Sequence, residues 1–243
     1  MNQDQNTVKK KRQNHESGSE ELKSFIYAVS HDLRAPLRAI HGFSTVLEEK
    51  ISDQLDATNL HYLHRILENV NMMTRQMDAL LQLSRVANME LNYSRIDTED
   101  MILSVNEELT SSDKNIDLEM GELPQISGDR KLIARCFKQL IANAIKFSSG
   151  KDHPRIKVSG KSENEQTIIS IEDNGVGFDP KYSDKLFLMF QRLHDEDEFE
   201  GIGAGLALVK KIIDMHDGRV WAESTPGEGA TFYLSIPNLT NNE

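Results

Sequence analysis

The chain has 243 residues, of which 38% are hydrophobic and 28% charged, a composition typical of globular domains. Its formal net charge of −11 argues against a general nucleic-acid-binding protein, which would usually carry a basic face. The single cysteine, Cys136, excludes an intrachain disulfide, and there is no signal peptide and no apolar run long enough to span a bilayer, so we expect a reducing, cytoplasmic setting.

Residues 1–20 read as a lead-in, and the region 21–90 that follows has helical periodicity. Apolar residues recur at steps of three and four, which places them on one helical face: Leu22, Ile26, Val29, Leu33, Leu37, Ile40, Leu47 and Ile51. After a turn near residues 52–56, a second run follows a heptad pattern with one polar break: Leu60, Leu63, Leu67, Val70, Thr74, Met77 and Leu81. These patterns predict two helices of about 30 residues in an antiparallel hairpin.

A lone hairpin cannot bury two apolar stripes completely, whereas two hairpins paired into a four-helix bundle can. We therefore expect a homodimer, with the hairpin as its dimerisation domain. The alternative is that the hairpin packs against a second domain of its own chain.

Beyond residue 95 the pattern changes, and strands, helices and glycine-rich loops alternate to residue 238. We expect a helix capped by Thr98, a long helix from the N-cap Asp129 through Phe147, and a further helix over residues 206–215. The expected strands cover residues 116–119, 155–159, 167–172, 219–223 and 230–236. This order predicts an α/β sandwich, so that the whole chain is of the α+β class.

Among the eight histidines, His31 is the candidate for chemistry. It lies about 200° around its helix from both Val29 and Leu33, on the outward face. Asp32 follows at once, and a neighbouring carboxylate can hold the proton of one ring nitrogen while the other nitrogen attacks. Pro36 is expected to bend this helix. A surface histidine beside an aspartate is more often only solvated, so the spacing alone leaves that interpretation open.

Residues 25–43, FIYAVSHDLRAPLRAIHGF, resemble the phospho-acceptor box of sensor histidine kinases and are most similar to the phytochrome-like branch, which often has Asp after the histidine. The resemblance implies that His31 receives a phosphoryl group and that Asp32 assists. Many relatives with phosphatase activity have Thr or Asn four residues after the histidine. Ala35 stands there in this chain, which predicts weak phosphatase activity.

Residues 139–148, QLIANAIKFS, place Asn143 and Lys146 on one helical face. An amide oxygen suits Mg²⁺ and a lysine suits phosphate, although such pairs are usually only a helix surface. The segment resembles the asparagine box of the same family, which implies that Asn143 holds Mg²⁺ and Lys146 contacts phosphate. The family often has Asn where this chain has Gln139, whose longer arm makes it a doubtful ligand.

Three further segments match the family in order. In DNGVGFDP (173–180), Asp173 ends a strand and Gly175 and Gly177 allow close approach of a ligand, although the pattern also occurs in tight turns and calcium loops. The resemblance implies that Asp173 accepts a hydrogen bond from the adenine amino group. The acidic run over residues 195–200 is expected to be a solvated lid tip.

The other two segments are KLFLMFQRLH (185–194) and GIGAGL (201–206). The first resembles the phenylalanine box of the nucleotide lid and the second a glycine box beside the triphosphate, at the start of a helix whose N-terminus favours anions. The resemblance gives nucleotide-binding roles to Phe187, Phe190, Arg192, Gly201, Gly203, Gly205 and Leu206. The chain has no P-loop sequence.

Taken together, the resemblance implies an ATP-binding sandwich of the histidine kinase, gyrase and Hsp90 type, with ATP and Mg²⁺ as cofactors. It further implies autophosphorylation of His31, transfer to an aspartate of a response-regulator receiver domain, and an upstream sensor domain or separate sensory chain. Residues 88–94 would be a mobile linker. The alternatives are a non-catalytic scaffold of kinase descent and an ATPase that drives conformational work. Residue types do not reveal whether the transfer occurs within one chain or across the dimer.

Overall fold

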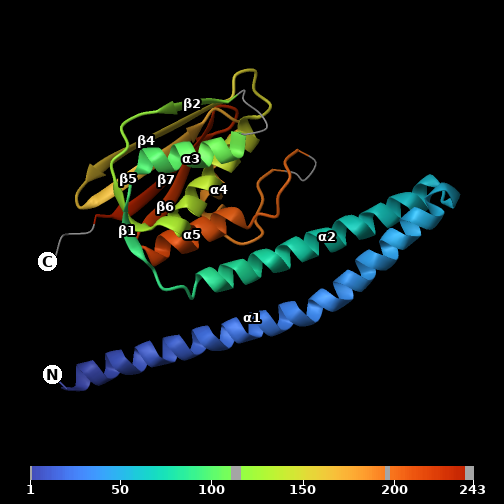
Figure 1. Ribbon diagram of the computed structural model, residues 1–243, viewed down its shortest axis with the longest axis horizontal. Helices are drawn as coiled ribbons and strands as arrows, with labels where there is room; N and C mark the ends of the chain where they lie inside the picture. Colours follow the sequence, from blue (N-terminus) through green and yellow to red (C-terminus); the bar gives the residue numbers. More distant parts are fainter. Residues whose placement is uncertain (1, 111–115, 195–197, 239–243) are drawn as a thin grey trace. The chain divides into compact units, whose positions relative to one another are not determined.

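The computed structural model describes residues 2–110, 116–194 and 198–238, and their side chains from residue 26 onward (Figure 1). The chain divides into two compact units, Met1–Arg85 and Val86–Glu243. Each unit has its own packing and is described by itself. Within the described part of the chain, no helix is both long enough and apolar enough to cross a membrane.

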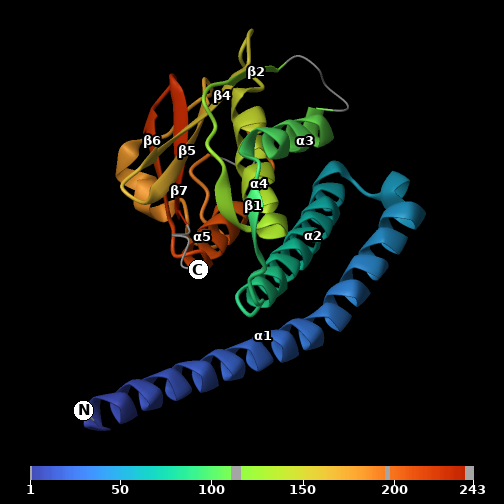
Figure 2. The ribbon, with the colours of Figure 1, turned by 60° about the vertical axis from the view of Figure 1, so that its left-hand side comes forward.

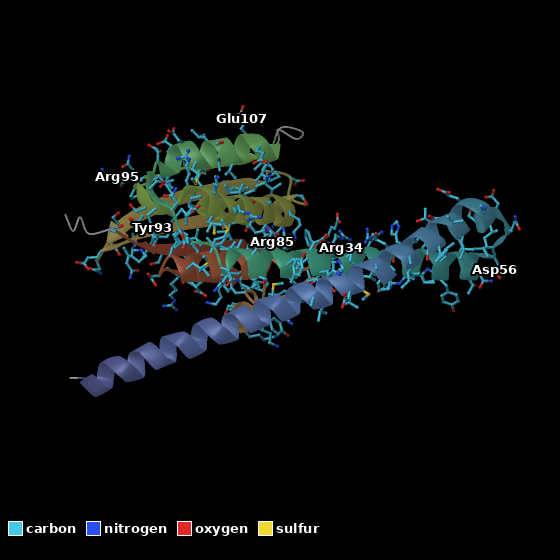
Figure 3. All side chains as sticks on the ribbon, turned by 60° about the horizontal axis from the view of Figure 1, so that its bottom comes forward. Arg34, Asp56, Arg85, Tyr93, Arg95 and Glu107 are labelled. Atoms are coloured by element: carbon cyan, nitrogen blue, oxygen red, sulfur yellow. The ribbon has the colours of Figure 1, made fainter. Side chains whose placement is uncertain are left out.

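The first unit is a helical hairpin. Helix α1 (Asn2–Ile51) is joined by the 3-10 helix η1 (Ser52–Gln54) to α2 (Ala57–Val86). Asp56, at the tip of the hairpin in Figure 3, begins α2 by accepting a hydrogen bond from the Asn59 backbone N–H at 2.8 Å. The expected hairpin and its turn are therefore confirmed.

Helix α1 is longer than expected, because it begins at Asn2 and has 50 residues. The lead-in contains many Lys, Arg, Gln and Glu residues, which favour helix, and its first glycine is Gly18. Pro36 lies inside α1, and Figure 2 shows that the helix is bent, as a proline inside a helix requires.

Only part of the first apolar run is buried within the hairpin. Leu37 packs with Val70 and Met77 in a small core, and Ser30 and Ser44, seven residues to either side of Leu37, are buried as well. Ile26 and Ile51 are half-buried, and four other residues of the expected stripe stay 38% to 48% exposed: Val29, Leu33, Ile40 and Leu47. Leu22 lies outside the described side chains.

Polar side-chain contacts join α1 and α2 at two places among the described residues. Arg34, labelled in Figure 3, donates from Nη2 to Asp78 Oδ1 at 2.9 Å. His64 Nε2 lies 3.1 Å from Glu48 Oε1. This contact of His64 is half-exposed.

The second unit is built on a five-stranded mixed sheet in the order β2-β4-β5-β7-β6. Strand β2 pairs with β4 in parallel, and the other pairs are antiparallel. The strands are β2 (Asp117–Met120), β4 (Arg155–Glu163), β5 (Gln166–Asp173), β6 (Arg219–Thr225) and β7 (Gly229–Pro237). All five expected strands are therefore confirmed.

Three helices cover one face of this sheet, which Figure 2 shows edge on: α3 (Thr98–Thr110), α4 (Arg130–Ser148) and α5 (Gly205–Met215). The core lies between the two layers. Alternate sheet residues such as Ile156 and Val158 point into it, and α4 contributes Phe137, Leu140 and Ile141, all fully buried.

Two details of the second unit differ from expectation. Helix α3 is capped by Asp97, whose carboxylate accepts from the Asp100 N–H at 3.1 Å, and Thr98 instead donates to the Pro124 carbonyl at 2.6 Å while fully buried. A two-stranded sheet of β1 (Tyr93–Ile96) and β3 (Ile126–Asp129) was not expected. The expected N-cap of α4 is confirmed, because Asp129 Oδ1 accepts from the Lys131 and Leu132 N–H groups.

Candidate functional site

The second unit contains a cavity of about 410 Å³, between α4, the end of β5 and the segment that precedes α5. Nine of the residues singled out in the sequence line its wall: Asn143, Lys146, Asp173, Gly177, Arg192, Gly201, Gly203, Gly205 and Leu206. These residues come from four separate sequence segments, and the fold brings them together.

Helix α4 presents its amides to this cavity. Its apolar face, including Leu140 and Ala144, is buried in the core, whereas Gln139, Asn143 and Lys146 line the cavity. Asn143 is only 8% exposed, and its Oδ1 accepts a hydrogen bond from Gln139 Nε2 at 3.2 Å. Gln139 therefore belongs to the cavity wall, beside the residue that the resemblance makes a metal ligand.

Asp173 is the buried acid of the cavity. It ends β5, is 5% exposed, and accepts a hydrogen bond from the Gly175 N–H at 2.9 Å. Burial raises the pKa of Asp173 to about 6, although the N–H groups of Gly175 and Ala230 lower it in part, and the nearby charge of Glu172 adds to the rise. A buried carboxylate with spare acceptor capacity suits a neutral N–H donor, such as an exocyclic amino group.

Three glycines of the wall have a positive φ that other residues rarely adopt, and at two of them a side chain would also clash. Gly177 has φ +63°, and a Cβ there would lie 2.3 Å from the Thr225 carbonyl oxygen. Gly203 has φ +68°, and a Cβ there would lie 2.4 Å from the Gln191 carbonyl oxygen. Gly175 does not line the cavity, because it packs against the Phe147 carbonyl at the end of α4.

The two phenylalanines expected in the lid are placed outside the cavity wall. Phe187 is half-buried against the core of the unit. Phe190 is 37% exposed, and its N–H donates to the Gly203 carbonyl at 2.8 Å. This hydrogen bond joins Phe190 to Gly203, the two ends of a segment that includes Arg192.

Two cationic side chains line the cavity, and both donate hydrogen bonds to neighbouring backbone carbonyls, those of residues 199 and 200. Lys146 Nζ donates to the Glu200 carbonyl at 3.2 Å, and Arg192 Nη2 donates to the Phe199 carbonyl at 2.9 Å. Burial lowers the pKa of Lys146, as does the charge of Arg192, while Glu200 opposes the shift. Phosphate oxygens could replace these carbonyl acceptors without leaving either cation unpaired.

An aromatic cluster in the wall was missed at the sequence level. The rings of Phe147, His194 and Phe199 contact one another at centroid distances of 5.0 to 5.5 Å, and Lys146 lies over the Phe147 ring at 4.3 Å. The sequence indicated a solvated tip over residues 195–200. Residues 195–197 lie outside the described part of the chain, and Phe199 packs in this cluster.

The candidate acceptor lies in the other unit, on α1. His31 and Asp32 have side chains 74% and 83% exposed, and His31 Nδ1 lies 3.3 Å from Asp32 Oδ1. The expected outward position of His31 is what the structure has. Among the described residues, no group of three or more His, Cys, Asp and Glu side chains could hold a metal ion. The amide oxygen of Asn143 together with ligand oxygens would suit Mg²⁺ on a nucleotide.

Two protein families match the chain. Residues 21–88 match the His Kinase A (phospho-acceptor) domain, and residues 128–240 match the Histidine kinase-, DNA gyrase B-, and HSP90-like ATPase family. The first match covers the hairpin, including His31, and the second covers α4, the cavity and the last strand.

Curated relatives resemble nearly the whole chain. Phytochrome-like protein Cph1 of Synechocystis is 36% identical over 92% of this chain and 30% of its own length. Cyanobacterial phytochrome A of Nostoc is 38% identical over 91% of this chain and 29% of its own length. The methanogenesis regulatory histidine kinase FilI of Methanothrix harundinacea is 34% identical over 91% of this chain. The chain spans no more than 30% of the length of these relatives.

Solved structures share the fold. Full-length ShkA in complex with AMPPNP superposes with a TM-score of 0.61 at 23% identity, over 87% of this chain and 45% of that one. The histidine kinase AdeS of Acinetobacter baumannii gives 0.57 at 23% identity, over 86% of this chain and 98% of that one. The catalytic domain of the histidine kinase ThkA gives 0.52 at 24% identity, over 60% of this chain and 96% of that one.

Proposed function

Because the chain belongs to the histidine kinase family, we propose that it uses ATP to phosphorylate its own His31 and passes the phosphoryl group to an aspartate on a response-regulator receiver domain, in two-component signal transduction. In the first step the bond between the γ-phosphorus and the bridging oxygen of ATP breaks, ADP leaves, and a bond forms from phosphorus to a ring nitrogen of His31. In the second step the aspartate carboxylate displaces the ring nitrogen.

The observation that carries this proposal is the cavity wall that joins Asn143, Lys146, Asp173 and the glycine segments. Asp173 would accept from the adenine amino group, and Lys146 and Arg192 would exchange their carbonyl partners for phosphate oxygens. Asn143 would hold Mg²⁺, which when bound neutralises charge on the phosphate oxygens. Glycines 201, 203 and 205 would let the backbone approach the phosphates.

Asp32 would activate His31 as the nucleophile. Asp32, 3.3 Å from Nδ1, keeps the ring proton on that nitrogen and leaves Nε2 of His31 with its lone pair. As positive charge develops on the ring during attack, the same carboxylate stabilises it. The transfer requires the cavity and His31 to meet, so residues 88–94, which follow α2, would move.

The active form would be a homodimer. The exposed stripe of Val29, Leu33, Ile40 and Leu47 lies within roughly 40° around α1, and a second hairpin would bury it in a four-helix bundle. The receiver domain would dock on the hairpin below His31. A sensory domain, in the same chain or in a separate one, would regulate this core, as the phytochrome-like relatives suggest.

Incubation with γ-labelled ATP and Mg²⁺ tests the proposal. We expect an acid-labile, alkali-stable label that is lost in His31→Gln and kept in His61→Gln, a matched control because His61 is an exposed histidine of the same hairpin. A label that survives in His31→Gln would assign the acceptor elsewhere. Bound ATP without any label would favour a scaffold, and ATP hydrolysis without label would favour an ATPase.

A further inference from the structure

Gln139 stands where the family often has Asn, and its contacts give it a specific role. It lies one helical turn before Asn143 on α4, and its Nε2 donates to Asn143 Oδ1 at 3.2 Å. An amide has a donor end and an acceptor end of nearly the same shape, so its partners decide which end faces a ligand. With Gln139 as donor, the oxygen of the Asn143 amide is fixed on the side of Gln139 and keeps one lone pair for a cation.

The amide of Gln139 is itself held in place from the other side by the start of α5. A Cβ on Gly205 would lie 2.2 Å from Gln139 Cδ, 2.3 Å from Nε2 and 2.6 Å from Oε1. Gly205 therefore leaves the space that this amide fills, and the side chain of Gln139 connects Asn143 to the glycine-rich segment 201–206. Both Gln139 and Gly205 line the cavity.

We propose that Gln139 is a positioning residue that sets the orientation of the Asn143 amide oxygen toward the nucleotide-bound Mg²⁺ and ties it to the start of α5. The inference rests on the proposed function. Mg²⁺ demands near-ideal octahedral geometry with oxygen ligands, and a reversed Asn143 amide would present an NH₂ group to it. In this role Gln139 would act on the ion through Asn143, so its loss should weaken the contribution of Mg²⁺ to nucleotide binding and spare the rest.

Calorimetric titration of the full chain with AMPPNP, in MgCl₂ and in EDTA, measures this contribution as the ratio of the two affinities, here called the Mg²⁺ gain. Gln139→Met keeps the length of the side chain and removes the donor. We expect it to reduce the Mg²⁺ gain on the order of tenfold, as loss of a group that orients a metal ligand does. The affinity in EDTA should change by less than about twofold, because Asp173 and the cations are untouched.

Lys138→Met is the matched control, since Lys138 is the adjacent residue on α4, is exposed and lies outside the cavity wall. We expect both of its affinities to equal those of the wild type. An unchanged Mg²⁺ gain in Gln139→Met, or an equal loss of affinity with and without Mg²⁺, overturns the inference. A wild-type chain that binds no AMPPNP overturns the proposed function and the inference with it.

A double-mutant cycle tests the contact with Gly205. In the wild type, Gly205→Ala forces the Gln139 amide away from its place and should lower the Mg²⁺ gain. In a Gln139→Ala background there is no amide to displace, so Gly205→Ala should have little further effect on the Mg²⁺ gain. The affinity in EDTA is expected to fall in both backgrounds, because Gly205 belongs to the segment beside the phosphates. If Gly205→Ala lowers the Mg²⁺ gain equally in the two backgrounds, the proposed role of Gln139 is wrong. Fluorescence of Trp221, the single tryptophan, checks that each variant keeps the second unit folded.

Discussion

Asp173 shows how a single residue can be placed for binding at a cost to stability. The fold buries it at the end of β5 with hydrogen bonds from Gly175 and Ala230, yet burial still raises its pKa to about 6. Because the unfolded chain has an ordinary aspartate pKa, the folded state binds more protons between these two values. The contribution of Asp173 to stability is therefore largest below its unfolded pKa and is lost as pH rises through about 6.

Asp173→Asn should separate the effect of this carboxylate on stability from its effect on nucleotide binding. An asparagine can keep the hydrogen bond from Gly175 without carrying a charge, so we expect the second unit to be more stable than the wild type at pH 8, by about 1 to 3 kcal/mol. The advantage should vanish near pH 4, where the wild-type residue is also neutral. Denaturant unfolding followed by Trp221 fluorescence measures the stability at both pH values. The affinity for AMPPNP should fall in the same variant. A less stable Asp173→Asn at pH 8 would contradict this account.

His216 is a second buried residue, and its hydrogen bonds determine which ring nitrogen carries the proton. It is 2% exposed, its Nδ1 lies 2.7 Å from the Ile212 carbonyl and accordingly donates to it, and its Nε2 accepts from the Asp129 N–H at 3.0 Å. A neutral ring with the proton on Nδ1 satisfies both partners. The residue thus ties the end of α5 to the start of α4.

His216→Phe keeps a ring of similar size but leaves two buried backbone groups without partners. We expect the free energy of unfolding of the second unit to fall by about 1 to 3 kcal/mol, measured by Trp221 fluorescence in denaturant. His153→Phe is the control, because His153 is exposed, and it should change the free energy by less than about 0.5 kcal/mol. Equal stability of the two variants would argue against this role for His216.

At the scale of the elements, local sequence patterns predicted the long helices and strands well. Asp129 caps α4 as its sequence position indicates, and the alternation of residues 155–159 and 167–172 predicts β4 and β5. The short strands β1 and β3 were missed because YSRI and ISGD have four residues each and no clear alternation. The residue type of Thr98 predicts a cap, but the carboxylate of the preceding Asp97 accepts the capping hydrogen bond instead.

The faces of the hairpin helices were predicted only in part, because periodicity marks apolar faces without saying what covers them. Leu37 is buried by α2 of the same chain, while Ile40 stays 44% exposed. Ile40→Asp should therefore convert a dimer into a monomer at micromolar concentrations, since it places a charge in the bundle core. Sedimentation equilibrium measures the mass.

Ala39→Asp is the matched control for Ile40→Asp. It adds the same charge at an exposed position about 100° around α1. This variant should remain dimeric. If both variants keep the mass of a dimer, the exposed stripe of α1 is not the dimer interface.

At the scale of the whole molecule, the order of motifs carried most of the functional prediction. The helical angle between His31 and its apolar neighbours predicted an exposed histidine, and it is 74% exposed. The cavity unites segments far apart in sequence, including Asn143 and Asp173. Its aromatic cluster and the contact of Gln139 with Gly205 could not be foreseen, because both depend on how the lid segment and α5 pack against α4.

The central claim is that a phosphoryl group reaches His31 on the nitrogen that Asp32 leaves free. NMR of protein labelled with ¹⁵N-histidine, after incubation with ATP and Mg²⁺, distinguishes the two ring nitrogens directly. With Asp32 3.3 Å from Nδ1, we expect the phosphorus on Nε2 of His31. Phosphorus on Nδ1, or on any other histidine, would contradict the account.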